Sequence, residues 1–207
     1  MAFLALHDGS VSRIAVAATL WPDVSEDHAY ASLRSAISRL TGSARGAIRV
    51  SLHELGLADD VDVDLRSSQA LAHRLLASDS TAWQAADLTT AAVAGLSADL
   101  LPDWYDDWAV LEAEDWRQLR MHALEALAGH LTAGHRYGDA TLAALAAVRA
   151  EPLRESARGA LIRVHLAEGN QSEALTEFRR YRSLLLSELG LEPTPRLSLL
   201  LETLQRP

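Results

Sequence analysis

The chain has 207 residues, contains no cysteine and carries a formal net charge of −9 at pH 7. The lack of cysteine excludes a disulfide framework and thiol catalysis, and the length suits one or two domains. All 19 basic residues are arginine and 28 residues are acidic, so nucleic acid cannot bind over the whole surface. Residues 28–53 nevertheless contain four arginines and no acidic residue. We therefore expect an anionic ligand, with DNA as the leading candidate, at this stretch.

Three helices are predicted in the first 40 residues. Residues 1–6 have the pattern of a helix end, and Ser12 can begin a second helix that stops before Pro22. Ser25 can begin the third helix, because two acidic residues follow it in the first turn, where the helix dipole favours them. Helical periodicity then continues to Leu40.

The predicted helix over residues 25–40 has two different faces. One face is apolar and would be buried; it carries Leu33, Ala36, Ile37 and Leu40. The opposite face is rich in serine and arginine. The candidate DNA-binding residues on this outer face, its edge and the following segment are Ser32, Arg34, Ser35, Ser38, Arg39, Arg45 and Arg49.

Two short strands are predicted after this helix, over residues 48–51 and 61–65, around a loop that contains Gly56. Helix, turn, helix and hairpin follow one another in this order in a winged helix. In that fold the third helix enters the major groove and the hairpin is the wing. We expect Ser35, Ser38 and Arg39 to face base edges, and Arg34, Arg45 and Arg49 to neutralise phosphates.

From residue 65 onward the pattern is almost entirely helical, with a predicted break at Asp79 and Ser80. An internal repeat lies in this part: the sequence HLTAG at residues 130–134 recurs as HLAEG at residues 165–169. A period near 34 residues with two helices per unit is typical of tetratricopeptide repeats. Each unit leaves an apolar face that its neighbour covers, so we expect a stack of helices.

With both halves assigned, the chain resembles the SARP family, the antibiotic-regulatory transcription activators of actinomycetes. In that family an OmpR-like winged helix precedes a bacterial transcriptional activator domain. The matching segments, in family order, are AFLALH (2–7), LWPD (20–23), LRSAISRL (33–40), DVDL (62–65), DLLPDWYDDW (99–108) and ELGLEP (188–193). Two departures are visible: the N-terminal sheet of family members has no counterpart here, and Thr41 stands where the family often has another arginine.

We therefore expect a mostly α protein with two domains. Residues 1–64 would form a partial winged helix-turn-helix that lacks the N-terminal sheet, and residues 65–207 a tetratricopeptide-like α-helical activator domain. The resemblance implies a transcription activator that binds direct repeats in promoter DNA as a homodimer and recruits RNA polymerase holoenzyme. It implies neither catalysis nor a cofactor, and a cytoplasmic location without a membrane span.

Two other interpretations start from different residues. Residues 99–115 contain seven acidic residues and no basic one, but we expect an acidic surface with Trp104 and Trp108 docked into the helical core, rather than a metal or glycosidase site. The histidines lack the spacing of a metal-binding motif, so no metal site is expected.

The alternative function is a tetratricopeptide-like protein-interaction module that no longer binds DNA on its own.

Overall fold

The computed structural model describes residues 1–77 and 83–202, so the predicted break at Asp79 and Ser80 lies outside the described residues. The chain divides into two compact units. Unit 1 is Met1–Leu65 with Asp103–Glu112, and unit 2 is Arg66–Pro102 with Ala113–Pro207. Over the two described ranges, no helix is both long enough and apolar enough to cross a membrane.

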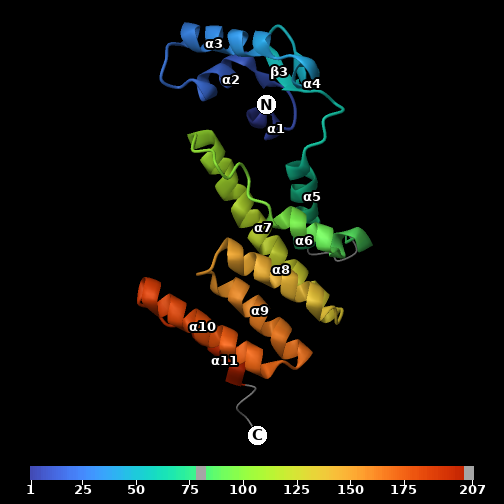
Figure 1. Ribbon diagram of the computed structural model, residues 1–207, viewed down its shortest axis with the longest axis vertical. Helices are drawn as coiled ribbons and strands as arrows, with labels where there is room; N and C mark the ends of the chain where they lie inside the picture. Colours follow the sequence, from blue (N-terminus) through green and yellow to red (C-terminus); the bar gives the residue numbers. More distant parts are fainter. Residues whose placement is uncertain (78–82, 203–207) are drawn as a thin grey trace. The chain divides into compact units, whose positions relative to one another are not determined.

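Unit 1 contains short helices and a small antiparallel sheet (Figure 1). Its elements are α1 (Ala2–Ala5), β1 (Val11–Ser12), α2 (Arg13–Leu20), α3 (Glu26–Arg39), α4 (Gly42–Gly46), β2 (Ile48–Val50) and β3 (Glu54–Leu57). The strand order is β1-β3-β2, with both pairs antiparallel. The predicted helix starts are confirmed, because Ser12 and Ser25 are the residues before α2 and α3. The expectation that these serines cap the helices with their side chains is wrong, because neither forms a capping hydrogen bond, and the hydroxyl of Ser25 contacts Nδ1 of His28 at 3.1 Å instead.

The second strand of the hairpin is β3, and the prediction of a strand over residues 61–65 is wrong. The hairpin turns directly after β2, because the hydroxyl oxygen of Ser51 accepts hydrogen bonds from the amides of His53 at 3.3 Å and Glu54 at 2.9 Å. The valines within residues 61–65 are half-buried against the core of unit 1 without strand pairing. The helix α5 (Asp64–Leu76) already begins within this stretch.

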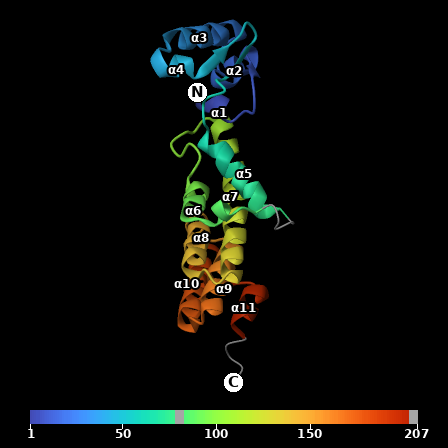
Figure 2. The same cartoon turned by 90° about the vertical axis from the view of Figure 1, so that its right-hand side faces the viewer.

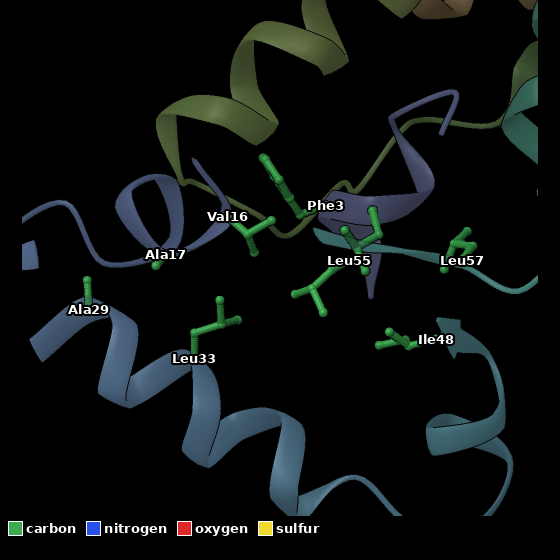
Figure 3. Packing of buried hydrophobic residues seen from close by; sticks show 9 residues of the cluster. Phe3, Val16, Ala17, Ala29, Leu33, Ile48, Leu55 and Leu57 are labelled. Atoms are coloured by element: carbon green, nitrogen blue, oxygen red, sulfur yellow. The ribbon is translucent and has the colours of Figure 1, made fainter. Parts of the chain in front are cut away.

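The core of unit 1 fixes the inner face of α3. Figure 3 shows Val16 of α2, Leu33 of α3 and Leu55 of β3 lying around one interior, with Phe3 of α1 beside them. Each of these side chains is at most 7% exposed. Burial of one such side chain stabilises the fold by about 2 kcal/mol, so the orientation of α3 is strongly specified. The opposite face of α3 is left to solvent.

Trp108 also belongs to this core, although the sequence predicts that Trp104 and Trp108 dock into the helical half. The ring of Trp108 meets Phe3 edge-on, with 5.3 Å between ring centroids, and Trp108 packs against the core of unit 1. The rings of Trp104 and Trp108 also lie edge to face, with 5.5 Å between their centroids, but Trp104 remains 45% exposed. The prediction was wrong because segment Asp103–Glu112, which includes the first residues of the long helix α7, joins unit 1.

Unit 2 is built of stacked helices. They are α5, the 3-10 helix η2 (Ala85–Leu88), α6 (Thr90–Ser97), α7 (Asp107–Ala133), α8 (Tyr137–Ala150), α9 (Glu155–Glu168), α10 (Gln171–Leu189) and α11 (Pro195–Glu202). Figures 1 and 2 show α8, α9 and α10 side by side in chain order, and α11 packs beside α9. Four fully buried alanines of α8 let neighbouring helices approach closely; they are Ala140, Ala143, Ala144 and Ala147.

The predicted repeat is confirmed as two helix pairs, α7 with α8 and α9 with α10. Each copy of the repeated sequence ends the first helix of its pair at a glycine. Gly169 caps α9 in the left-handed region with φ of 91°, which lets the amide of Asn170 donate to the carbonyl of His165 at 2.8 Å. The second half therefore has the tetratricopeptide-like architecture that the spacing predicted.

Candidate nucleic-acid interface

The outer face of α3 presents the predicted serines and arginines. Arg34, Ser35, Ser38 and Arg39 are exposed, whereas Ser32 is half-buried at the margin. Their exposure follows from the helical period, because the apolar face of the same helix is held in the core of unit 1. Four of the five predicted residues on α3 are therefore open to a ligand.

The carbonyl of Ser35 organises the end of this face. It accepts a hydrogen bond from the hydroxyl of Ser38 at 2.9 Å and another from Nε of Arg39 at 3.2 Å. Arg39 uses Nε for this contact, and within residues 1–77 and 83–202 its two terminal amino groups have no hydrogen-bond partner. A guanidinium held in this way offers a fork to a ligand with two acceptors, such as the major-groove edge of guanine.

Tyr30 lies between two guanidinium groups. Arg34 lies over the ring with its Cζ 5.6 Å from the centroid, and Arg13 does so at 5.3 Å. Arg13 also donates to the carbonyl of Ser51 in the hairpin turn at 3.4 Å, which places it between α3 and the wing. The sequence gives no signal for Arg13, because this residue stands alone at the start of α2, outside the acid-free stretch.

The two arginines beyond α3 differ in their partners. Arg45 donates to the carbonyl of Ile48 at 3.1 Å and pairs with no acid in the described part of the chain. Arg49 of β2 instead forms an ion pair with Asp59, with 2.5 Å between Nη1 and Oδ1. The two side chains are 51% and 85% exposed, so the pair contributes only about 0–1 kcal/mol and a phosphate can compete for Arg49. Sequence spacing gave no sign of Asp59, which lies ten residues further on.

A metal centre does not emerge from the geometry. Within residues 1–77 and 83–202, no group of three or more histidine, aspartate or glutamate side chains is arranged to hold a metal ion. In the acid-rich segment, Trp104 is 45% exposed and Tyr105 84% exposed.

Comparison with known proteins places the chain in a family. Residues 61–205 match the family model of the bacterial transcriptional activator domain. The chain belongs to this family, and the match covers most of its length. A comparison with curated proteins found none that matches.

The whole chain is also similar in structure to EmbR of Mycobacterium tuberculosis, solved in complex with a low-affinity phosphopeptide. The TM-score is 0.62 and the sequence identity 24%, and the match covers 100% of this chain and 58% of that one. The mostly α fold class and the resemblance to the SARP family are thus confirmed. The family match identifies a bacterial transcriptional activator domain, and the likeness to EmbR shows the fold.

Proposed function

We propose that this chain is a transcription activator that binds double-stranded promoter DNA through α3 and the hairpin β2–β3. The observation that carries the proposal is the outer face of α3. Its two arginines, Arg34 and Arg39, are exposed and have no acidic partner among the residues that the structure describes, while the inner face is fixed in the core. Unneutralised guanidinium groups at a fixed spacing are suited to the phosphates and base edges of a DNA groove.

The candidate residues divide into two roles. Ser35, Ser38 and Arg39 would face base edges, since they share the exposed face of α3 and Arg39 has free terminal amino groups. Arg34, Arg45 and Arg49 would neutralise phosphates; Arg13 joins them because it links α3 to the wing. Half-buried Ser32 would contact DNA only at the margin of this face.

A second step of the proposal concerns assembly. A few phosphate contacts per protomer give weak binding, so two protomers on direct repeats would gain affinity by acting together. We propose a homodimer on DNA that recruits RNA polymerase holoenzyme, in the cytoplasm and without catalysis. Residues 1–64 would carry DNA binding, and residues 65–207 would support pairing and activation.

The experiment is fluorescence anisotropy of the full chain with labelled promoter DNA from the regions that flank its own gene. About three or four phosphate contacts per protomer predict a log–log salt slope near −3 per protomer, on the scale of about −0.9 per contact. Binding must also survive an excess of unrelated DNA. A folded chain that shows no saturable binding at low salt contradicts the proposal.

A protein-interaction module is the second candidate, and one observation favours it. Segment Asp103–Glu112 exposes Tyr105 and Trp104 among four acidic residues, which is a surface suited to a basic protein partner. The two functions separate in the same experiment. DNA binding that depends on α3 supports the activator, whereas absence of DNA binding by the folded chain leaves the interaction module.

A further inference from the structure

A pocket of about 170 Å³ lies between α9 and α11 in unit 2. Two arginines line it, one from each helix, and two leucines of α11 form an apolar side. The lining residues are Glu155, Ser156, Gly159, Arg163, Arg196, Leu197 and Leu200. The DNA-binding proposal does not use this pocket, which belongs entirely to unit 2.

The two arginines of the pocket lack protein partners. Neither Arg163 nor Arg196 forms a hydrogen bond or a close ion pair with another residue that the structure describes. Packing desolvates the guanidinium of Arg163 and lowers its pKa; Glu125 opposes this shift and the like charge of Arg196 adds to it. Both side chains are exposed, so two like charges lie within electrostatic reach of each other and are open to a ligand.

The other polar groups of the lining are already engaged. Oε2 of Glu155 accepts the amide of Thr194 at 2.9 Å, and Oε1 accepts the hydroxyl of the same threonine. The hydroxyl of Ser156 donates to Oε1 of Glu125 at 2.8 Å. The acid of the pocket thus holds the start of α11 and forms no ion pair with either arginine.

Gly159 gives the pocket its shape. A Cβ at this position would lie 3.3 Å from Nη1 of Arg163 and 3.3 Å from Cδ1 of Leu197. The missing side chain lets the guanidinium of Arg163 lie back along α9 while Leu197 of α11 packs closely against the same point. The bare backbone of Gly159 therefore leaves room for Arg163 and Leu197 side by side.

We propose that this pocket binds a small organic phosphate monoester, with Arg163 and Arg196 on the phosphate and Leu197 and Leu200 against its carbon atoms. A dianion balances two guanidinium charges, and phosphate oxygens match the fork of arginine. The volume is several times the roughly 30 Å³ that one water molecule occupies in the liquid, which leaves room beside the phosphate. A bound ligand would join α11 to α9. This site is independent of the proposed DNA binding.

The test is isothermal titration calorimetry with the full chain at constant ionic strength, with thermal unfolding in parallel. The probes are glycerol 2-phosphate, inorganic phosphate and succinate. We expect saturable 1:1 binding of glycerol 2-phosphate with a raised Tm, weaker binding of inorganic phosphate, and the weakest of succinate. Arg163→Gln and Arg196→Gln should each weaken binding about tenfold, and the double variant should abolish it.

Two further variants separate the site from general charge effects. Arg149→Gln, which removes an exposed arginine of α8, should leave the affinity unchanged. Gly159→Ala keeps both charges but crowds Arg163, so it should weaken binding several-fold; Arg163→Lys should weaken it because lysine lacks the fork. Unsaturable heats, equal affinity for succinate, or wild-type affinity in folded Arg163→Gln and Arg163→Lys would overturn the proposal.

Discussion

The arginines of the two units have different partners. In unit 1 the arginines are Arg13, Arg34, Arg39, Arg45 and Arg49, and among these only Arg49 forms an ion pair with a residue that the structure describes. In unit 2, arginines join helices and turns through acids that lie elsewhere in the chain. These pairs include Arg74–Asp87, Arg117–Glu151, Arg120–Asp99, Arg154–Glu125 and Arg158–Glu177. The same residue type therefore joins elements through ion pairs in much of unit 2, whereas most arginines of unit 1, and Arg163 and Arg196 of unit 2, remain available to a ligand.

The difference follows from where acids stand in the sequence. No acidic residue occurs within residues 28–53, so the arginines of α3 and α4 find no local partner. In unit 2, α7, α9 and α10 each contain both arginine and glutamate, and pairs such as Arg154–Glu125 and Arg158–Glu177 join different helices or the residues that flank them. The net charge of the chain does not show this difference, because it sums arginines that have an acidic partner with arginines that have none. Partners, and not arginine counts, distinguish structural arginines from candidate contacts.

The largest predicted effect is the loss of a buried pair in unit 2. The side chains of Arg158 and Glu177 are 7% and 10% exposed, and Arg158 also donates to the carbonyl of Pro152 at 3.3 Å. Arg158→Met leaves the carboxylate of Glu177 buried without its main partner. We expect the free energy of unfolding to fall by about 3–5 kcal/mol, measured by urea denaturation followed by circular dichroism.

A double variant separates two contributions to the lost stability: the cost of a buried charge without its partner, and the loss of packing. The double variant Arg158→Met with Glu177→Met removes both charges and should recover most of the lost stability. If the double variant is as unstable as the single one, packing around Arg158, and not its pairing, stabilises unit 2.

A smaller effect concerns the acid dependence of unit 2. Arg74 donates to both carboxylate oxygens of Asp87, at 3.0 and 2.7 Å, and this contact lowers the pKa of Asp87 below its ordinary value. Because the pKa of Asp87 is lower in the folded chain than in the unfolded chain, the unfolded chain binds a proton at this carboxylate at a higher pH. The stabilisation that the contact between Arg74 and Asp87 gives to the folded chain is thus complete above about pH 4. It is lost as the pH falls through the pKa of Asp87 in the folded state.

Comparison of the wild type with Asp87→Asn over a pH series checks this expectation. The wild type should be the more stable at pH 6, and the difference should shrink as the pH falls below about 4. A difference in unfolding free energy that stays constant over this range would show that Asp87 titrates alike in both states.

The smallest effect should appear in unit 1, at the ion pair between Arg49 and Asp59. Asp59→Asn releases Arg49 for a phosphate, so we expect DNA affinity to rise about threefold by fluorescence anisotropy. Asp62→Asn is the matched control, since it removes an exposed acid nearby with the same change in net charge. Equal gains in the two variants would mean that net charge, and not the release of Arg49, sets the affinity.

Local patterns predicted most of the fold. Helix starts at Ser12 and Ser25 and the glycine-ended repeats depend on neighbouring residues, which the sequence displays directly. The second strand of the wing was misplaced because apolar and acidic residues alternate over residues 61–65, as they do in a strand. The sequence does not show that the hydroxyl of Ser51 accepts the hydrogen bond that closes the turn directly after β2. Trp108 was misplaced because its partner, Phe3, is more than one hundred residues away.

The candidate interface was predictable only in part. The exposed face of α3 follows from helical period, and the structure exposes Arg34, Ser35, Ser38 and Arg39 as predicted. Contacts between elements were not visible in the sequence. The pairing of Arg49 with Asp59 across the hairpin and the placement of Arg13 beside Tyr30 both depend on the folded backbone.

The most direct test of the central claim is DNA binding by Arg34→Ala/Arg39→Ala beside Arg149→Ala/Arg179→Ala. Both double variants remove two exposed arginines, the first pair from α3 and the second from unit 2. In anisotropy titrations of promoter DNA, we predict a loss of about 100-fold or more for the first and little change for the second, with unchanged circular dichroism for both. Equal affinities for the two variants would contradict the claim that α3 is the DNA-binding helix.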